Sequence, residues 1–297
     1  YSPDDGRALG LLGMIDDMLE RCDFKTGVNV QKDDVANLKK NNKQSIARLI
    51  SAAENAPKEN KAALDKHWNT EVVGPRHNNN ELQRYSDDSF RFDNNELIIT
   101  MTKNGNDIKS GRINTKGKLQ IQYGYIEALI KFTGCKGLWP AFWMLGNSLH
   151  WPDCGEIDIM EWVGWNDSAI YGTLHGPGYC GGNAYGSGSK HITGRPLPNE
   201  YHKYAIEWKP DSIKWFFDDK LFFTATRNGL HQCKGNCHWT FNDRPFYLLL
   251  NFAVGGNFGG AFPNSENYIY QHLPQNNEFH ISYIKIYKTN DGYGTLI

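Results

Sequence analysis

The pattern of hydrophobic and polar positions divides the chain near residue 65. Residues 1–64 carry apolar side chains at helical spacing in two segments, with little of the alternation that strands require. Gly27 lies in the polar stretch between the segments, and Pro57 would end the second one. We therefore predict an N-terminal helical region over residues 1–64, arranged as a hairpin of two helices. The apolar positions are Leu9, Leu12, Ile15, Met18 and Leu19, followed by Ile46, Leu49, Ile50 and Ala53.

Residues 65–297 change to short runs of alternating apolar and polar residues, bounded by Gly, Asn, Asp and Pro. Asn104-Gly105 is a hairpin signal, and Asp218-Asp219-Lys220 is a short turn between two runs. Such a series predicts an all-β sandwich or barrel. Glycine-rich loops at 176–189 and 255–260 are long enough to be functional. The predicted strands are Glu96–Thr102, Tyr123–Phe132, Trp139–Leu145, Ile157–Val163, Ala169–Leu174, Tyr204–Trp208, Ile213–Phe217, Leu221–Thr226, Phe246–Val254 and Phe279–Tyr287.

Composition narrows the possible partners. The formal net charge of -1 argues against a nucleic-acid binder, which needs a clustered positive field. No apolar run reaches the roughly 20 residues that a membrane span needs, so we expect no membrane partner. Aromatic residues make up 13% of the chain, which suits stacking on sugar rings but also suits the core of a sandwich. Nothing in the sequence indicates an oligomeric state.

The cysteines indicate the compartment. Their even number, 6, fits an oxidising environment. The chain begins at Tyr1, which a removed signal peptide or a trimmed chain would explain, and we expect a secreted protein. Cys233 and Cys237 would close a small loop as a disulfide. Alternatively they would bind zinc together with His231 and His238, or stay free or pair differently.

Three acids lie within six residues of one predicted strand, at Glu156, Asp158 and Glu161. Side chains alternate along a strand, so Glu156 and Asp158 share a face while Glu161 falls on the other one. One extra residue in a β-bulge would restore the parity. We predict this bulge at Ile159-Met160, with all three carboxyl groups facing one groove.

Such a cluster suits glycosidic bond cleavage. Retaining hydrolysis needs two carboxyl groups about 5–5.5 Å apart, one as nucleophile and one as acid and then base. Neighbouring like charges raise the pKa of at least one acid, and the general acid must stay protonated near neutral pH. The alternatives are a solvated acidic edge or a calcium site built from the same oxygens.

Several separated motifs then resemble glycoside hydrolase family 16, in the form with one inserted residue that laminarinases carry. The central one is Trp151-Pro-x-Cys-Gly-Glu-Ile-Asp-Ile-Met-Glu161. The resemblance runs from about residue 64 to residue 287. Its other motifs include the segment 79–85, Ser110–Thr115, Gly137–Gly146, Gly172–Gly178, Glu207–Asp211 and Tyr247–Asn257.

The resemblance implies a concanavalin-like β-jelly-roll sandwich over residues 65–297, with the helical region as an N-terminal addition. It also implies that Glu156 is the nucleophile, that Glu161 is the acid/base and that Asp158 assists between them. Core packing is the alternative for each aromatic residue. The side chains expected to contact a glycan are Asn80, Arg112, Trp139, Trp143, Trp162, His175 and Asn257.

The sequence departs from the family pattern in two places. Tyr125 and Leu129 replace arginines of the family segment, which puts details of substrate affinity in doubt. The usual N-terminal strand is not evident, and Ser282 stands where relatives place an acid for structural calcium. We therefore expect no required cofactor or metal, and calcium less than in relatives.

The predicted function is endo-hydrolysis of β-1,3-glucan such as laminarin, and possible substrates extend to mixed-linkage glucan. The bulged motif and the loop His175–Tyr179 favour these substrates over agar or carrageenan. The alternatives are a transglycosylase using the same covalent intermediate and a non-catalytic glucan-recognition protein. Relatives of the last kind lose the glutamates, and both are present here.

Overall fold

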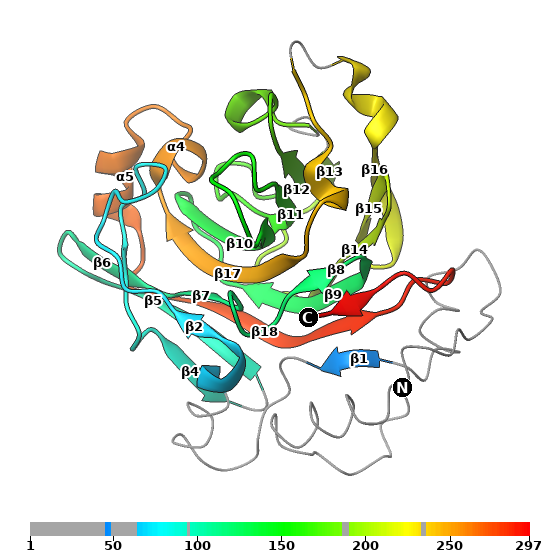
Figure 1. Ribbon diagram of the computed structural model, residues 1–297. Coiled ribbons are helices and arrows are strands. Elements are labelled where there is room, and N and C mark those ends of the chain that lie inside the picture. Colours follow the sequence, from blue (N-terminus) through cyan, green and yellow to red (C-terminus); the bar gives the residue numbers. More distant parts are fainter. Residues whose placement is uncertain (1–44, 49–63, 94–95, 186–189, 233–235) are drawn as a thin grey trace.

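The computed structural model describes residues 45–48, 64–93, 96–185, 190–232 and 236–297. Two β-sheets pack face to face and bend in the same direction, so that one sheet nests inside the other (Figure 1). The predicted all-β sandwich is therefore confirmed. The helical segments of the described residues are short and lie in the connections.

The outer sheet has ten strands. Eight of them run in the order β16 (Lys220–Thr226), β15 (Ser212–Phe217), β14 (His202–Lys209), β9 (Gly124–Phe132), β18 (Asn276–Tyr287), β5 (Glu96–Asn104), β6 (Asp107–Ser110) and β3 (Arg84–Tyr85). The other two are β4 (Phe90–Asp93), which pairs with β5, and β1 (Ser45–Arg48), which pairs with β18.

The inner sheet has nine strands. Its order is β13 (Lys190–Ile192), β12 (Ala169–His175), β11 (Glu156–Glu161), β10 (Leu138–Gly146), β17 (Phe246–Val254), β7 (Arg112–Asn114) and β2 (Asn69–Thr70), with β8 (Ile121–Gln122) and β19 (Thr295–Leu296) off this path. The helical segments of the described residues include 64–67, α4 (Gly256–Gly259), α5 (Ser265–His272) and the 3₁₀ segments Gly181–Asn183, Arg227–Gln232 and Thr240–Asn242. The concave face of the inner sheet points away from the outer sheet (Figure 1).

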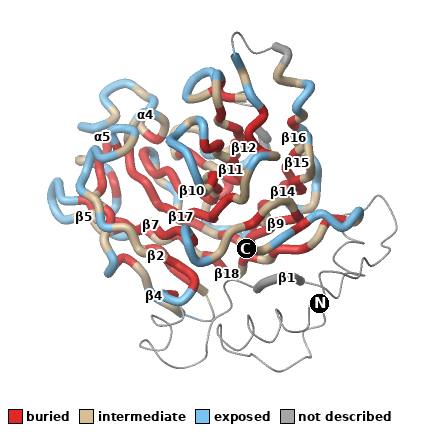
Figure 2. Tube along the Cα trace, viewed as in Figure 1, coloured by how far each residue is buried: buried red, intermediate tan, exposed pale blue. Residues whose placement is uncertain are grey.

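The core lies between the sheets because alternate residues of each strand point into it. On β9, Ile126 and Ile130 are fully buried and pack with Phe142 of β10 and Phe252 of β17. Figure 2 shows this buried layer running through both sheets. Burial of such side chains contributes about 25 cal/mol per Å² of apolar surface, which makes the two-sheet core the main source of stability.

The structure corrects one prediction for the N-terminal region. Ile46 and Ala47 lie in strand β1, whereas their periodicity predicted a helix and no N-terminal strand. The strand forms because Lys285–Tyr287 of β18 offers backbone groups that β1 pairs with, and tertiary pairing outweighs weak local propensity. Residues 1–44 and 49–63, which hold the first predicted helix and the rest of the second, lie outside the described residues.

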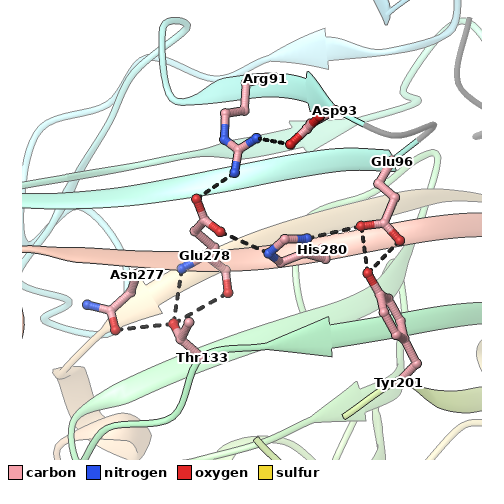
Figure 3. Close-up of polar contacts among 8 residues, drawn as sticks. All are labelled: Arg91, Asp93, Glu96, Thr133, Tyr201, Asn277, Glu278 and His280. Atoms are coloured by element: carbon pink, nitrogen blue, oxygen red, sulfur yellow. Dashed lines mark hydrogen bonds and ion pairs between the residues drawn. The ribbon is translucent and has the colours of Figure 1, made fainter. Parts of the chain in front are cut away.

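A charged cluster covers part of the outer sheet's outer face (Figure 3). His280 lies between two carboxylates, with Nδ1 3.0 Å from Glu96 and Nε2 3.0 Å from Glu278. Arg91 donates to Glu278 at 2.6 Å, and the hydroxyl of Tyr201 donates to Glu96. These contacts tie β4, β5 and β18 together on the face opposite to the core.

Candidate active site

The three acids come together because β11 contains the predicted bulge. Asp158 lies opposite Thr173 of β12, and Glu161 lies opposite Tyr171, so three steps on β11 match two on its partner. On the other side, Asp158 and Met160 lie opposite consecutive residues of β10, which leaves Ile159 as the extra residue. The bulge restores the parity of the strand. Glu156, Asp158 and Glu161 therefore share the concave face.

Burial and mutual repulsion raise the pKa values of the three carboxyl groups. Burial, followed by the charge of Asp158, raises the pKa of Glu156 to about 8. Burial also raises the pKa of Asp158 to about 7, and its hydrogen bond with Glu156 opposes that rise. Burial and then the charge of Asp158 hold the pKa of Glu161 well above its usual value. At neutral pH the cluster therefore keeps a proton that a general acid can donate.

His175 holds the other end of this cluster. It is the cross-strand partner of Glu156, and its Nε2 lies 3.2 Å from Oδ2 of Asp158. Its Nδ1 accepts a hydrogen bond of 3.1 Å from the backbone N–H of Gly181. A nitrogen that accepts carries no proton, so the neutral ring carries its proton on Nε2, facing Asp158.

Two tryptophans flank the acids on the concave face. The indole N–H of Trp139 donates to Glu161 at 3.0 Å, and that of Trp143 donates to Asn251 at 2.7 Å. The guanidinium of Arg112 lies 5.0 Å from the centre of the Trp143 ring. The ring of Phe258 in α4 packs edge-on against Trp139. The structure thus brings both tryptophans and Arg112 to the face that carries the acids.

Asn80 and Asn257 form a polar pair beside α4. The Asn80 amide donates to the Asn257 side chain at 2.9 Å. The same α4 packs on Trp139, since a Cβ added at Gly259 would lie 3.0 Å from the Trp139 side chain. Asn257 of α4 therefore borders the concave face at Trp139, and Asn80 lies beside it.

The prediction that Trp162 contacts substrate is wrong. Trp162 is 1% exposed, packs 5.0 Å from the Phe132 ring and donates its indole N–H to the carbonyl of Asp167. The reason is strand alternation: Glu161 points to the concave face, so the next residue points into the core.

Trp151 is a site residue that belongs to the family motif but was not among the side chains expected to contact a glycan. Its indole N–H donates to Glu156, and its ring lies 5.9 Å from that of His175. It is 51% exposed, which is unusual for tryptophan and leaves a face open to a ligand. Its position five residues before Glu156, within the same motif, is the feature of the sequence that could have identified Trp151 as a site residue.

Among the described residues, Glu156, Asp158 and His175 are the one group whose ligand atoms lie close enough for a metal, within 4.8 Å of one another. Glu156 and Asp158 share a hydrogen bond and both lie on the strand whose bulge brings the acids together, so we assign the group no metal. Ser282 lies at a register shift of β18 and offers a hydroxyl rather than a carboxylate. That no cofactor is required stays a prediction.

Cys237 is disulfide-bonded, which counts against a zinc site at this segment because a bridged sulfur is no thiolate ligand. Cys233, its predicted partner, lies outside the described residues. Within the described part of the chain, Cys135, Cys154 and Cys180 carry free thiols.

Comparison with known proteins finds several glucanases. The beta-glucanase of Rhodothermus marinus is 38% identical over 207 residues, which cover 65% of this chain and 71% of that protein. The glucan endo-1,3-beta-glucosidase A1 of Niallia circulans is 38% identical over 186 residues, which cover 60% of this chain but 26% of that protein. The laminarinase catalytic domain from Thermotoga maritima MSB8 superposes with a TM-score of 0.67 at 34% identity, covering 75% of this chain and 92% of that one.

The family model for glycosyl hydrolases family 16 matches residues 77–263, more than half of the chain. This range contains the bulged strand, its three acids and His175. The superposition with laminarinases also confirms the predicted β-jelly-roll sandwich. The chain therefore belongs to glycosyl hydrolase family 16.

Proposed function

We propose that the chain hydrolyses β-1,3-glucan internally and with retention of configuration. The observation that carries this proposal is the placement of Glu156 and Glu161 on one face of a bulged strand, with Asp158 between them. Each glutamate accepts from an indole N–H, but Glu156 also shares a hydrogen bond with Asp158, and carboxyl groups in different surroundings can take different roles. Trp151 donates to Glu156 and Trp139 donates to Glu161.

In the proposed reaction, Glu156 passes its proton to Asp158, attacks the anomeric carbon as a carboxylate and forms a glycosyl ester with the enzyme. Glu161 donates its proton to the departing glycosidic oxygen. It then takes a proton from water, which attacks the ester and releases the sugar with its original configuration. Asp158 contacts Glu156 and shares its proton, so it assists the change of charge on the nucleophile.

The substrate follows from the relatives and from the aromatic face. Both sequence relatives and the superposed structure carry glucanase or laminarinase names. Trp143 is partly exposed next to the acids, as stacking on glucose rings requires, whereas Trp139 is buried against Phe258 and meets the site through its N–H. Mixed-linkage glucan is a second substrate that we propose, because a Bacteroides ovatus mixed-linkage glucan hydrolase of this family superposes with a TM-score of 0.62 at 32% identity.

We also propose that the protein is secreted. Its proposed substrate is a polysaccharide that lies outside cells, and the disulfide at Cys237 suits an oxidising compartment. None of the helices in the described residues is long and apolar enough to cross a membrane.

The test is a panel of laminarin, curdlan, lichenan and agarose, with products sized by chromatography. We expect short oligosaccharides from laminarin early in the reaction, some release from lichenan and none from agarose. Products longer than the starting chains would indicate a transglycosylase. A folded protein inactive on every β-glucan would indicate a recognition protein, such as the Beta-1,3-glucan-binding protein of Penaeus monodon, which is 29% identical.

A further inference from the structure

The loop that follows β12 reaches the active site through one backbone group. The N–H of Gly181 donates to Nδ1 of His175 at 3.1 Å. Gly181 has a φ of +56°, in the region that favours glycine, and its backbone aims this N–H at the ring. The contact leaves the proton of the neutral ring on Nε2, 3.2 Å from Asp158.

A second segment, which contains Cys237 and His238 and is called the brace below, contacts this loop. The N–H of His238 donates to the carbonyl of Pro177 at 3.2 Å, and the hydroxyl of Tyr179 donates to the carbonyl of His238 at 2.9 Å. At Gly178, an added Cβ would lie 2.7 Å from Sγ of Cys237, so only glycine permits this approach. Cys237 is disulfide-bonded, which restrains the brace.

Tyr179 joins the brace to the loop. It is 3% exposed, and its backbone exchanges two hydrogen bonds with Gly176, of 2.8 and 3.0 Å. Gly176 follows His175 directly, and Gly181 lies two residues beyond Tyr179. The position of the Gly181 N–H therefore depends on the side chain of Tyr179.

We propose that Tyr179 is a positioning residue for catalysis, which together with the disulfide-bonded Cys237 segment holds the Gly181 N–H against His175 and so keeps the Nε2 proton of His175 next to Asp158. This inference rests on the proposed function. The Nε2 nitrogen lies 3.2 Å from Oδ2 of Asp158 without the geometry of a hydrogen bond. The partial positive charge of its N–H at this distance favours the ionised form of Asp158, which in turn contacts the nucleophile Glu156.

The titratable groups around His175 come from three segments. From β11 the carboxyl groups of Glu156, Asp158 and Glu161 act on it or contact it. From the loop, the free thiol of Cys180 adjoins Gly181. On the brace, the imidazole of His238 pairs with Asp243 at 2.7 Å. The carboxyl cluster on β11 is therefore the partner whose protonation the ring controls.

The test is Tyr179→Phe, which keeps the buried ring and removes its bond to His238. Tyr185→Phe is the matched control, because the Tyr185 ring lies 6.5 Å from that of Tyr179 but its hydroxyl accepts from the N–H of Thr226. We expect ¹⁵N NMR of the His175 ring to show the Nε2–H tautomer in wild type and control and a tautomer mixture in Tyr179→Phe. The acidic limb of kcat/KM on laminarin should move up by roughly half a pH unit, because the charged form of the cluster loses part of a favourable electrostatic contact with the ring.

Reduction of the wild-type disulfide is the second arm, and it applies even if Tyr179→Phe does not fold. We expect the same change of tautomer and of the acidic limb. One tautomer and an unchanged acidic limb in both arms would overturn the inference. A wild type without hydrolysis would overturn the proposed function instead, and the tautomer measurement would still test the role of Tyr179.

Discussion

At the scale of single residues, the acids of β11 are more expensive to bury than ordinary side chains. The pKa of Glu156 is raised to about 8, so its ionised form is disfavoured in the folded protein. An acid whose pKa is higher in the folded than in the unfolded protein stabilises the fold at pH values below its unfolded pKa, here 4.5. That stabilisation is lost as the pH rises through the folded pKa. The ionised site therefore costs stability as the pH rises above 4.5 toward about 8.

Glu156→Gln should for this reason raise the melting temperature. We expect the gain over wild type to be small at pH 4.5 and to grow by a few degrees as the pH approaches about 8, in differential scanning calorimetry. Glu200→Gln is the control, because Glu200 is exposed and pairs with Arg195 at the surface. A gain that does not change with pH would show that burial of the Glu156 charge has no such cost.

Glu161→Ala should separate substrates by their leaving groups. The proton from Glu161 is needed to expel a sugar hydroxyl, whereas an activated aryl group leaves without it. We expect a loss of kcat/KM on laminarin that is at least about a hundredfold larger than the loss on an aryl β-glucoside oligomer. Similar losses on the two substrates would reject Glu161 as the general acid.

At the scale of elements, β11 shows how far the sequence predicts a site. The acids, their order and the bulge follow from strand parity, and the structure places the extra residue at Ile159. The prediction for Trp162 was wrong because the bulge places Glu161 on the concave face, and strand alternation then places the next residue in the core. The contacts of Trp151 and Gly181 depend on loops, whose backbone geometry is not encoded in a short local pattern.

Deletion of Ile159 tests the parity argument. It leaves the acids at every second position, so a regular strand places all three on the concave face without a bulge. We expect the variant to keep measurable laminarin hydrolysis, in contrast to Glu156→Gln, which should have none. A folded deletion variant with no activity would mean that the bulge itself, and not only parity, sets the geometry.

The charged cluster of the outer sheet predicts a different pH dependence (Figure 3). The Arg91 guanidinium is the main cause of the lowered pKa of Glu278. An acid whose pKa is lower in the folded than in the unfolded protein stabilises the fold at pH values above its unfolded pKa, here 4.5. That stabilisation is lost as the pH falls through the folded pKa.

Arg91→Met should therefore lower the melting temperature near pH 7, and the difference from wild type should vanish as the pH falls below 4.5. The effect is modest because both side chains are partly exposed. Arg227→Met, which removes a single exposed partner of Asp211, is the comparison. A deficit that persists in acid would show a packing role for Arg91 instead.

At the scale of the whole molecule, the sequence predicted the two-sheet sandwich and placed the chemistry on one strand of it. Long strands such as β9, β17 and β18 follow from buried runs and turns, because a large core leaves few alternatives. Strand β1 did not follow, since its four residues gain their structure from the edge of β18. The boundary at residue 65 and the role of residues 1–64 stay predictions.

The central claim is that Glu156 and Glu161 carry out retaining hydrolysis of β-1,3-glucan. It is tested most directly by ¹H NMR of the anomeric protons in the first minutes of laminari-oligosaccharide cleavage, before mutarotation. We expect the β-anomer of the new reducing end to appear first and to convert slowly to the α-anomer. First appearance of the α-anomer would mean direct attack by water, and would contradict a covalent intermediate on Glu156.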